Sequence, residues 1–141
     1  MPTEEDTPTR VGIGLVGRAG SYLIRRRPEG QAMAGRWEFP GGKCEPGESP
    51  EVATARECLE EIGVEVEVGG LVRRVVHRYP HGLIELNFYR GSTRCEPLAD
   101  SGFIWVPAGE LASYDFPGAN DEVVALLARE AADPAASPRD E

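Results

Sequence analysis

The chain has 141 residues, of which 40% are hydrophobic, and this length suits one domain with its own core. Its net charge of -9 and pI near 4.8 argue against a nucleic-acid polymer as partner, because phosphate backbones require basic surface. The first residues lack the basic and apolar regions of a signal peptide, and no apolar run approaches membrane-spanning length. We therefore expect a cytoplasmic protein that binds small molecules and no membrane.

The order of expected elements predicts an α/β or α+β fold with a mixed sheet flanked by helices. Residues 1–9 and 133–141 are polar, charged or proline-containing, and we expect them to be flexible tails around a single domain of residues 10–132. Apolar runs separated by glycine and proline predict strands at Val11–Val16, Ser21–Arg26, Trp37–Phe39, Val64–Val68, Leu71–His77, Leu83–Tyr89 and Phe103–Val106, and apolar periodicity predicts a closing helix at Asp121–Ala132.

A short acidic helix is predicted between Ser49 and Gly63. Ser49 suits the N-cap, Pro50 the first helical position and Gly63 the stop. On a helical wheel, an apolar side made by Val52, Ala55, Leu59 and Ile62 lies opposite an acidic side made by Glu57, Glu60 and Glu61. Like charges this close destabilise a helix unless a cation neutralises them, and a bound divalent metal would do so.

The plain alternative is a solvated acidic face, which is the default for a surface helix. The preceding loop favours a site instead, because Pro40-Gly41-Gly42 and Pro46-Gly47 flank Lys43, and glycines let backbone groups approach an ion or a phosphate closely. Arg56 lies one turn before Glu60 and can orient its carboxylate. Together these features predict a carboxylate-held metal and phosphate chemistry.

Residues 42–64 resemble the complete Nudix box. Gly42, Glu48 and the run Arg56-Glu57-Cys58-Leu59-Glu60-Glu61-Ile62-Gly63-Val64 fill its defined positions, with Cys58 a less common residue at an apolar one. The resemblance implies an α/β/α sandwich and hydrolysis of a nucleoside diphosphate-linked substrate with Mg²⁺ or Mn²⁺. It implies that Glu57, Glu60, Glu61 and the Gly41 carbonyl ligate the metal, with Glu57 as the preferred base, Glu60 the next choice and Arg56 assisting. We expect Glu48 to support the loop, since loop acids commonly bind backbone amides.

Two flanking segments, residues 36–43 and 114–121, are similar to MutT-type 8-oxo-dGTP diphosphatases. That similarity implies that Phe39 forms a pocket wall and Arg27 assists nucleotide binding. It also implies that Asn120 reads the oxidised guanine through an amide that both donates and accepts. Glu38, Pro40 and Gly41 complete the expected substrate-binding set. The implied reaction converts 8-oxo-dGTP to the nucleoside monophosphate and pyrophosphate, which would cleanse the nucleotide pool.

Each of these assignments has an alternative. Phe39 could be simple core, Asn120 only a helix N-cap, and Arg27 part of a solvated run of arginines. The chain also departs from the MutT-type pattern, with Ala32 where a histidine is common and Gly82 where a basic residue is expected, His81 being a possible substitute.

These departures leave other substrates open, namely a CTP or dCTP derivative, ADP-ribose or a dinucleotide. A nucleotide-sensing module without turnover is a further alternative, against which the intact set of Arg56 and three glutamates speaks. A further metal-binding carboxylate is expected from Asp100 or Glu96. The protein could be a monomer or a homodimer. Three cysteines without metal-ligand spacing indicate reduced thiols, with Cys58 as a small core residue.

Overall fold

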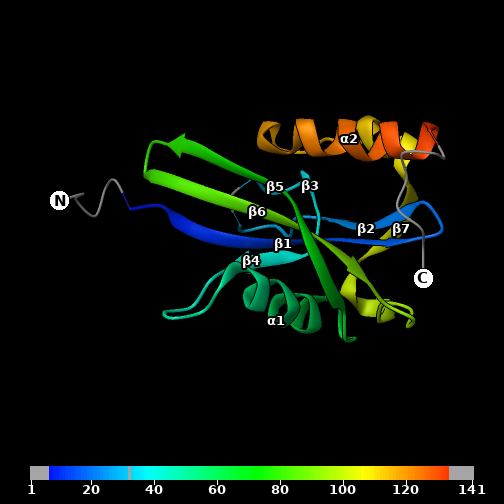
Figure 1. The fold of residues 1–141 in the computed structure, drawn as a ribbon, viewed down its shortest axis with the longest axis horizontal. Helices are drawn as coiled ribbons and strands as arrows, with labels where there is room; N and C mark the ends of the chain where they lie inside the picture. The colour runs from blue at the N-terminus through cyan, green and yellow to red at the C-terminus, as the bar shows by residue number, and fades with distance from the viewer. Residues whose placement is uncertain (1–6, 32, 134–141) are drawn as a thin grey trace.

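The computed structural model describes residues 7–31 and 33–133, so most of the two expected tails and Ala32 lie outside the described residues. Within these ranges a mixed seven-stranded sheet separates two helices, α1 (Pro50–Ile62) and α2 (Asp121–Ala132), which confirms the expected sandwich (Figure 1). The strands are β1 (Thr9–Arg18), β2 (Ser21–Arg26), β3 (Trp37–Glu38), β4 (Gly41–Lys43), β5 (Glu67–Tyr79), β6 (Gly82–Ser92) and β7 (Ile104–Pro107), joined in part by 3-10 helices η2 (Ala99–Ser101), η3 (Ala108–Ser113) and η4 (Gly118–Asn120).

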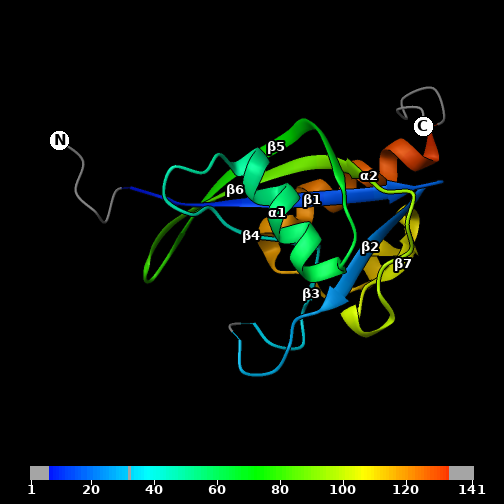
Figure 2. The same ribbon diagram turned by 90° about the horizontal axis from the view of Figure 1, so that it is seen from below.

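Strand β1 is the centre of the sheet. It pairs in parallel with β6 and in antiparallel with β4 and β2, and the main strand order is β3-β2-β1-β6-β5. The short strand β4, which was expected to be loop, pairs with β1 so that Gly12 lies opposite Gly42. This pairing fixes the segment that leads into α1 at the middle of the sheet (Figure 2).

The two strands expected on either side of Gly69-Gly70 are replaced by one strand, β5, which begins only at Glu67 and so leaves out Val64–Val66 of the expected Val64–Val68. The glycines do not end it; instead the register with β6 shifts between Val68 and Leu71 and again between Leu71 and Arg73. A bulged strand keeps its pairing partner while it bends, so glycine marks irregularity here and not a break.

Helix α1 begins and ends as the sequence predicts. Oγ of Ser49 accepts a hydrogen bond from the N–H of Val52 at 3.2 Å, and Pro50 opens the first turn. Gly63 adopts the left-handed conformation at φ 87°, and its N–H donates to the Leu59 carbonyl. These caps satisfy backbone groups that the helix itself leaves without partners.

The predicted apolar side of α1 is wrong for two of its four members. Val52 and Leu59 are 56% and 47% exposed, whereas Ile62 is buried as expected and small side chains make much of the remaining contact with the sheet. A Cβ atom at Gly12 would overlap backbone and side-chain atoms of α1, so the helix lies against bare strand backbone there. Because α1 packs so close to β1, small residues are favoured on its buried side. A helical wheel that ranks residues by hydrophobicity does not detect this preference. The buried residues of α1 are Pro50, Ala53, Thr54, Cys58 and Ile62.

Each face of the sheet carries an apolar core. The α2 side is built around Leu15, Ile24, Phe39, Phe88, Leu111, Phe116, Val123 and Leu127, and the α1 side around Val16, Leu23, Cys58, Ile62, Val66 and Phe103. Helix α2 has the bounds that the sequence predicts.

Cys58 is fully buried, as expected, and burial raises the pKa of its thiol to about 12. All three cysteines lie in the described part of the chain and carry free thiols. In that same part, no helix is both long enough and apolar enough to span a membrane.

Candidate active site

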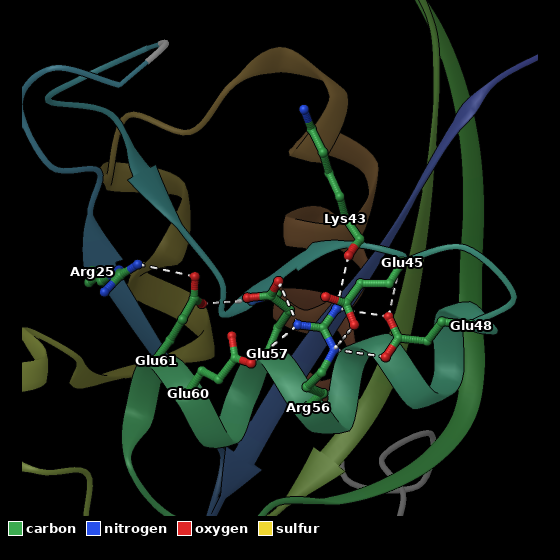
Figure 3. Close-up of polar contacts among 9 residues, drawn as sticks. Arg25, Lys43, Glu45, Glu48, Arg56, Glu57, Glu60 and Glu61 are labelled. Atoms are coloured by element: carbon green, nitrogen blue, oxygen red, sulfur yellow. Dashed lines mark hydrogen bonds and ion pairs between the residues drawn. The ribbon is translucent and has the colours of Figure 1, made fainter.

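Arg56 is the centre of an ion-pair cluster on α1 and the loop before it (Figure 3). Its Nε and Nη2 donate to the two carboxylate oxygens of Glu48 at 2.7 and 2.8 Å. Its Nη1 contacts Glu57 at 3.2 Å and Glu60 at 3.3 Å, the latter being the orientation that the sequence predicts. Nη2 also donates to the Lys43 carbonyl at 3.1 Å. One guanidinium therefore ties the loop to two of the three acids of α1.

Glu48 acts in this cluster as a support for the loop, as expected. Its carboxylate accepts the N–H of Glu45 at 2.9 Å in addition to the two bonds from Arg56. The hydrogen bonds from Arg56, followed by the one from the Glu45 backbone, lower the pKa of Glu48 to about 2. A charged acid thus locks the turn that precedes α1.

Glu57 lies against the backbone of β4. A Cβ atom at Gly42 would overlap its carboxylate, so only glycine leaves room for that group. The Glu57 side chain is 19% exposed and that of Glu60 is 57% exposed. Glu57 is therefore the more constrained of the two acids of α1 that contact Arg56.

Glu61, like Glu57, is a partly buried acid of α1, with 21% of its side chain exposed. Its Oε1 accepts the N–H of Gly41 at 3.0 Å, and its Oε2 lies 3.2 Å from Nη2 of Arg25. Burial raises the pKa of Glu61 to about 7, although the Gly41 hydrogen bond and the charge of Arg25 oppose the rise. A further cation close to Glu61 would therefore favour the charged form of its carboxylate.

The donor set suits a hard divalent cation. As they stand, no three acidic, histidine or cysteine side chains of the described residues are arranged to hold a metal ion, and the acids of α1 are paired with arginines. Yet Glu57, Glu60 and Glu61 lie within two turns of one helix, and Gly41 lies beside Glu61. Carboxylate and carbonyl oxygens are the ligands that Mg²⁺ and Mn²⁺ prefer. When bound, such an ion would screen phosphate charge and activate water.

A pocket of about 430 Å³ opens on the face of the sheet against which α2 packs. It brings together four members of the expected substrate-binding set, Arg27, Glu38, Phe39 and Asn120. The rest of its lining is Thr9, Val11, Ile13, Met33, Trp37, Gly42, Lys43, Tyr79, His81, Ile84, Leu86 and Pro117. The other two members of that set do not line it: Pro40 is buried and accepts the N–H of Gly14 at 2.8 Å, and Gly41 bonds Glu61.

The pocket bears on the alternatives left open by the sequence. Phe39 is both core and wall, because it is 4% exposed and stacks on Phe116 at 5.0 Å while still lining the pocket. Asn120 makes no side-chain cap bond to α2; its Nδ2 donates to the Pro117 carbonyl at 3.1 Å. Arg27 is held by Glu38 at 2.7 Å and is not a simple solvated charge.

Sequence reasoning missed two contributors. Tyr79 lines the pocket between two histidines, its ring centroid 4.5 Å from that of His77 and 5.6 Å from that of His81. A strand ending in an aromatic before Pro80 was the available signal. Arg25, which contacts Glu61 and Glu38, had no signal beyond its place in a run of arginines. His81, named as a possible substitute for a basic residue, does reach the pocket.

The two candidates for a further carboxylate, Glu96 and Asp100, have different surroundings. Glu96 pairs with Arg18 and accepts the indole N–H of Trp105 at 3.1 Å, so its carboxylate is engaged at the end of β1. Asp100 is exposed in η2, which begins directly after Leu98. The N–H of Leu98 donates to the carbonyl of Ile62, so this segment lies at the C-terminal end of α1. Metal binding by either one stays a prediction.

Strand β4 connects the pocket to the acids. Gly42 and Lys43 line the pocket, while Gly42 also abuts Glu57 and the Lys43 carbonyl accepts from Arg56. In Figure 3 the Lys43 side chain extends away from the acidic cluster. A ligand whose base occupies the pocket can therefore direct a phosphate tail across β4 toward the carboxylates.

Comparison with known proteins decides the family, since a NUDIX domain is matched over residues 12–126. This chain belongs to the Nudix hydrolase family. It is 34% identical to the 8-oxo-dGTP diphosphatase of Escherichia coli over 85% of this chain and 96% of that protein. It is also 34% identical to the CTP pyrophosphohydrolase of the same organism, over 62% of this chain and 75% of that protein. The solution structure of the E. coli ORF135 protein superposes with a TM-score of 0.77 at 30% identity, covering 96% of this chain and 99% of that one.

Family membership confirms that the protein is a Nudix pyrophosphohydrolase. Nudix hydrolases act on small nucleotide substrates and generally use divalent metal ions, in agreement with the donor set and the pocket. The roles of individual residues and the identity of the nucleotide go beyond this family assignment.

Proposed function

We propose that this Nudix hydrolase converts 8-oxo-dGTP, or a related deoxynucleoside triphosphate, to the monophosphate and pyrophosphate with Mg²⁺. The observation that carries this proposal is the shared strand β4, which lines the nucleotide-sized pocket on one side and abuts Glu57 on the other. The base would bind in the pocket, and the phosphates would lie over the acids of α1. Glu57, Glu60, Glu61 and the Gly41 carbonyl would hold the metal, with Glu57 accepting a proton from the attacking water.

An oxidised purine fits the chemistry of the pocket. Phe39 offers an aromatic wall, and Asn120 offers an amide that can donate and accept on the edge of a base. Relatives named 8-oxo-dGTP diphosphatase support the same choice at 34–35% identity. In a cell this activity would remove oxidised nucleotides before polymerases use them, and we place it in the cytoplasm.

A cytidine nucleotide is the second candidate. The relative named CTP pyrophosphohydrolase is as similar in sequence as the E. coli 8-oxo-dGTP diphosphatase, although over less of the chain. The chain also has Gly82, next to the pocket residue His81, where the MutT-type pattern has a basic residue. The contact of the base with Asn120 would then distinguish the two candidates, because a pyrimidine is smaller than a purine.

The decisive experiment is a substrate panel with Mg²⁺ that compares 8-oxo-dGTP, dGTP, CTP, dCTP and ADP-ribose. We expect the highest kcat/KM for 8-oxo-dGTP, with pyrophosphate as the product. A higher kcat/KM for CTP or dCTP would overturn the purine assignment and leave hydrolysis intact. Absence of turnover on every substrate, with nucleotide binding retained, would favour the sensing module.

The variant Glu57→Gln tests the proposed base within the same panel. We expect kcat to fall by about a thousandfold, because loss of a general base or a metal ligand typically costs this much, while the melting temperature stays close to wild type. Glu51→Gln is the matched control, since Glu51 lies exposed on the first turn of the same helix. Full activity of Glu57→Gln would remove Glu57 from the chemistry.

A further inference from the structure

Arg25, near the end of β2, contacts both Glu38, which lines the pocket, and Glu61 of the acidic helix, and Figure 3 shows the second contact. Its Nε donates to Oε2 of Glu38 at 2.9 Å, and its Nη2 donates to Oε2 of Glu61 at 3.2 Å. On the pocket side, Glu38 also accepts from Arg27 at 2.7 Å. On the helix side, Glu61 also accepts the N–H of Gly41. A continuous chain of charged hydrogen bonds therefore joins the pocket to a candidate metal ligand.

The position of the Arg25 guanidinium is well determined by its surroundings. Its side chain is 18% exposed, and those of Glu38 and Glu61 are 17% and 21% exposed, so solvent screens these contacts less than it screens surface pairs. The guanidinium also lies over the Phe103 ring, 4.8 Å from its centroid. Arg25 sits opposite Glu38 in the β2–β3 pairing, which sets the distance between them.

The shape of the guanidinium matters for this task. Its planar fork of donors can serve two carboxylates in fixed directions at once, whereas a lysine ammonium at this site could serve one well and the other poorly. Without a cation at position 25, Glu38 would keep its bond from Arg27, but Glu61 would keep only the Gly41 N–H, and no positive charge would lie between the two partly buried carboxylates. Their mutual repulsion would then move the Glu61 carboxylate away from its place beside Gly41.

We infer that Arg25 is a positioning residue that holds Glu61 in the geometry of the metal site and couples it to occupation of the pocket through Glu38. The inference rests on the proposed function, in which Glu61 is a metal ligand. Arg25 itself touches neither metal nor nucleotide in this scheme. It acts by fixing one ligand before the ion arrives, which lowers the free energy needed to organise the site.

The alternative is that the Arg25 pairs only brace β2, β3 and α1. A brace would affect unfolding but would not affect metal affinity in the folded protein. The test therefore measures Mn²⁺ binding to the nucleotide-free protein by electron paramagnetic resonance of the free ion. Melting temperature, and kcat and KM for the best substrate of the panel, are measured on the same samples.

Three variants make the comparison. Arg25→Ala should weaken Mn²⁺ binding by about tenfold or more and lower kcat by a similar factor, as loss of a group that orients a metal ligand typically does. Arg25→Lys should recover part of the affinity. Arg26→Ala is the matched control, because Arg26 is the next residue on the same strand and is exposed; its Mn²⁺ affinity and kcat should stay within about twofold of wild type.

Coupling to the pocket is tested with Glu38→Gln. Although Glu38 contacts no expected metal ligand, this variant should weaken Mn²⁺ binding in the wild-type background and have no further effect when Arg25 is already alanine. Two additive effects would show that the residues act separately and would overturn the coupling.

Wild-type Mn²⁺ affinity in Arg25→Ala, with or without a lower melting temperature, would overturn the positioning role. If Arg25→Ala does not fold, Arg25→Lys decides, and wild-type affinity there has the same consequence. Failure of the proposed function gives a different result, since the wild-type protein would then turn over none of the nucleotides although the Mn²⁺ measurements could still be made.

Discussion

At the residue scale, the site depends on which polar groups share a partner. Arg56 forms hydrogen bonds to three carboxylates and a carbonyl, and Arg25 to two carboxylates, so two guanidiniums hold Glu57, Glu60 and Glu61. Gly42 contributes by having no side chain, because any Cβ there would displace Glu57. The arrangement of the cluster therefore depends on glycine at position 42 as well as on the charges of its side chains.

Asn120 carries the residue-scale prediction for base recognition. Asn120→Ala should raise KM for 8-oxo-dGTP by about fivefold to tenfold and raise KM for dGTP less, because a lost amide contact costs on the order of 1 kcal/mol. Asn120→Asp is the informative control, since it keeps an acceptor and loses the donor. Steady-state kinetics on the two nucleotides decides the matter, and equal changes for both would restrict Asn120 to a structural role at the start of α2.

At the element scale, the approach of α1 to β1 positions the acids. Gly12 and Gly14 allow the helix to lie on strand backbone, and Gly12 also faces Gly42 across the β1–β4 pairing. Three glycines thus bring β1, β4 and α1 within contact distance of one another. Larger side chains at these positions would widen the helix–sheet spacing and carry Glu57 away from β4.

Gly12→Ala tests this packing. The added Cβ overlaps the Pro50 carbonyl and Oγ1 of Thr54, so we expect a loss of unfolding free energy of about 1–3 kcal/mol, with a lower kcat. Gly109→Ala is the matched control, because a Cβ there meets open space; its stability should stay near or slightly above wild type. Urea denaturation measures both, and equal stabilities would show that α1 shifts at no cost.

At the scale of the whole molecule, two apolar cores on opposite faces of the sheet hold the fold, and polar networks fix how its parts meet. The turn before α1 is the most dependent on charge, since Glu48 bridges the Glu45 backbone and Arg56. The acid stability of the folded protein should reflect that group.

The prediction concerns unfolding between pH 5 and pH 2. The pKa of Glu48 is lowered from 4.5 to about 2 in the folded protein, chiefly by its bonds to Arg56, so its contribution is complete above pH 4.5. That contribution is lost as the pH falls toward 2, because protonation must break these bonds. Glu48→Gln should therefore be less stable than wild type near neutral pH and should lose less stability on acidification. Thermal melts across this range measure the difference, and parallel curves would contradict the role.

The local sequence determined the parts of this protein that depend on neighbours in the chain. Helix α1 has its predicted caps because Ser49 and Gly63 act on backbone groups within one turn, and α2 has its predicted bounds because apolar periodicity is local. The Arg56–Glu60 contact follows from helical spacing in the same way.

Only the tertiary structure decided which face of α1 is buried, that β4 is a strand, and that Gly69-Gly70 lies inside a continuous β5. It also brought Arg25 to Glu61 and Tyr79 to Asn120 across distant parts of the chain. These features depend on contacts between distant segments, whose spacing is set by strand pairing and by glycines that allow close approach. Hydrophobicity and local propensity describe neighbours in the chain only, so neither predicts such contacts.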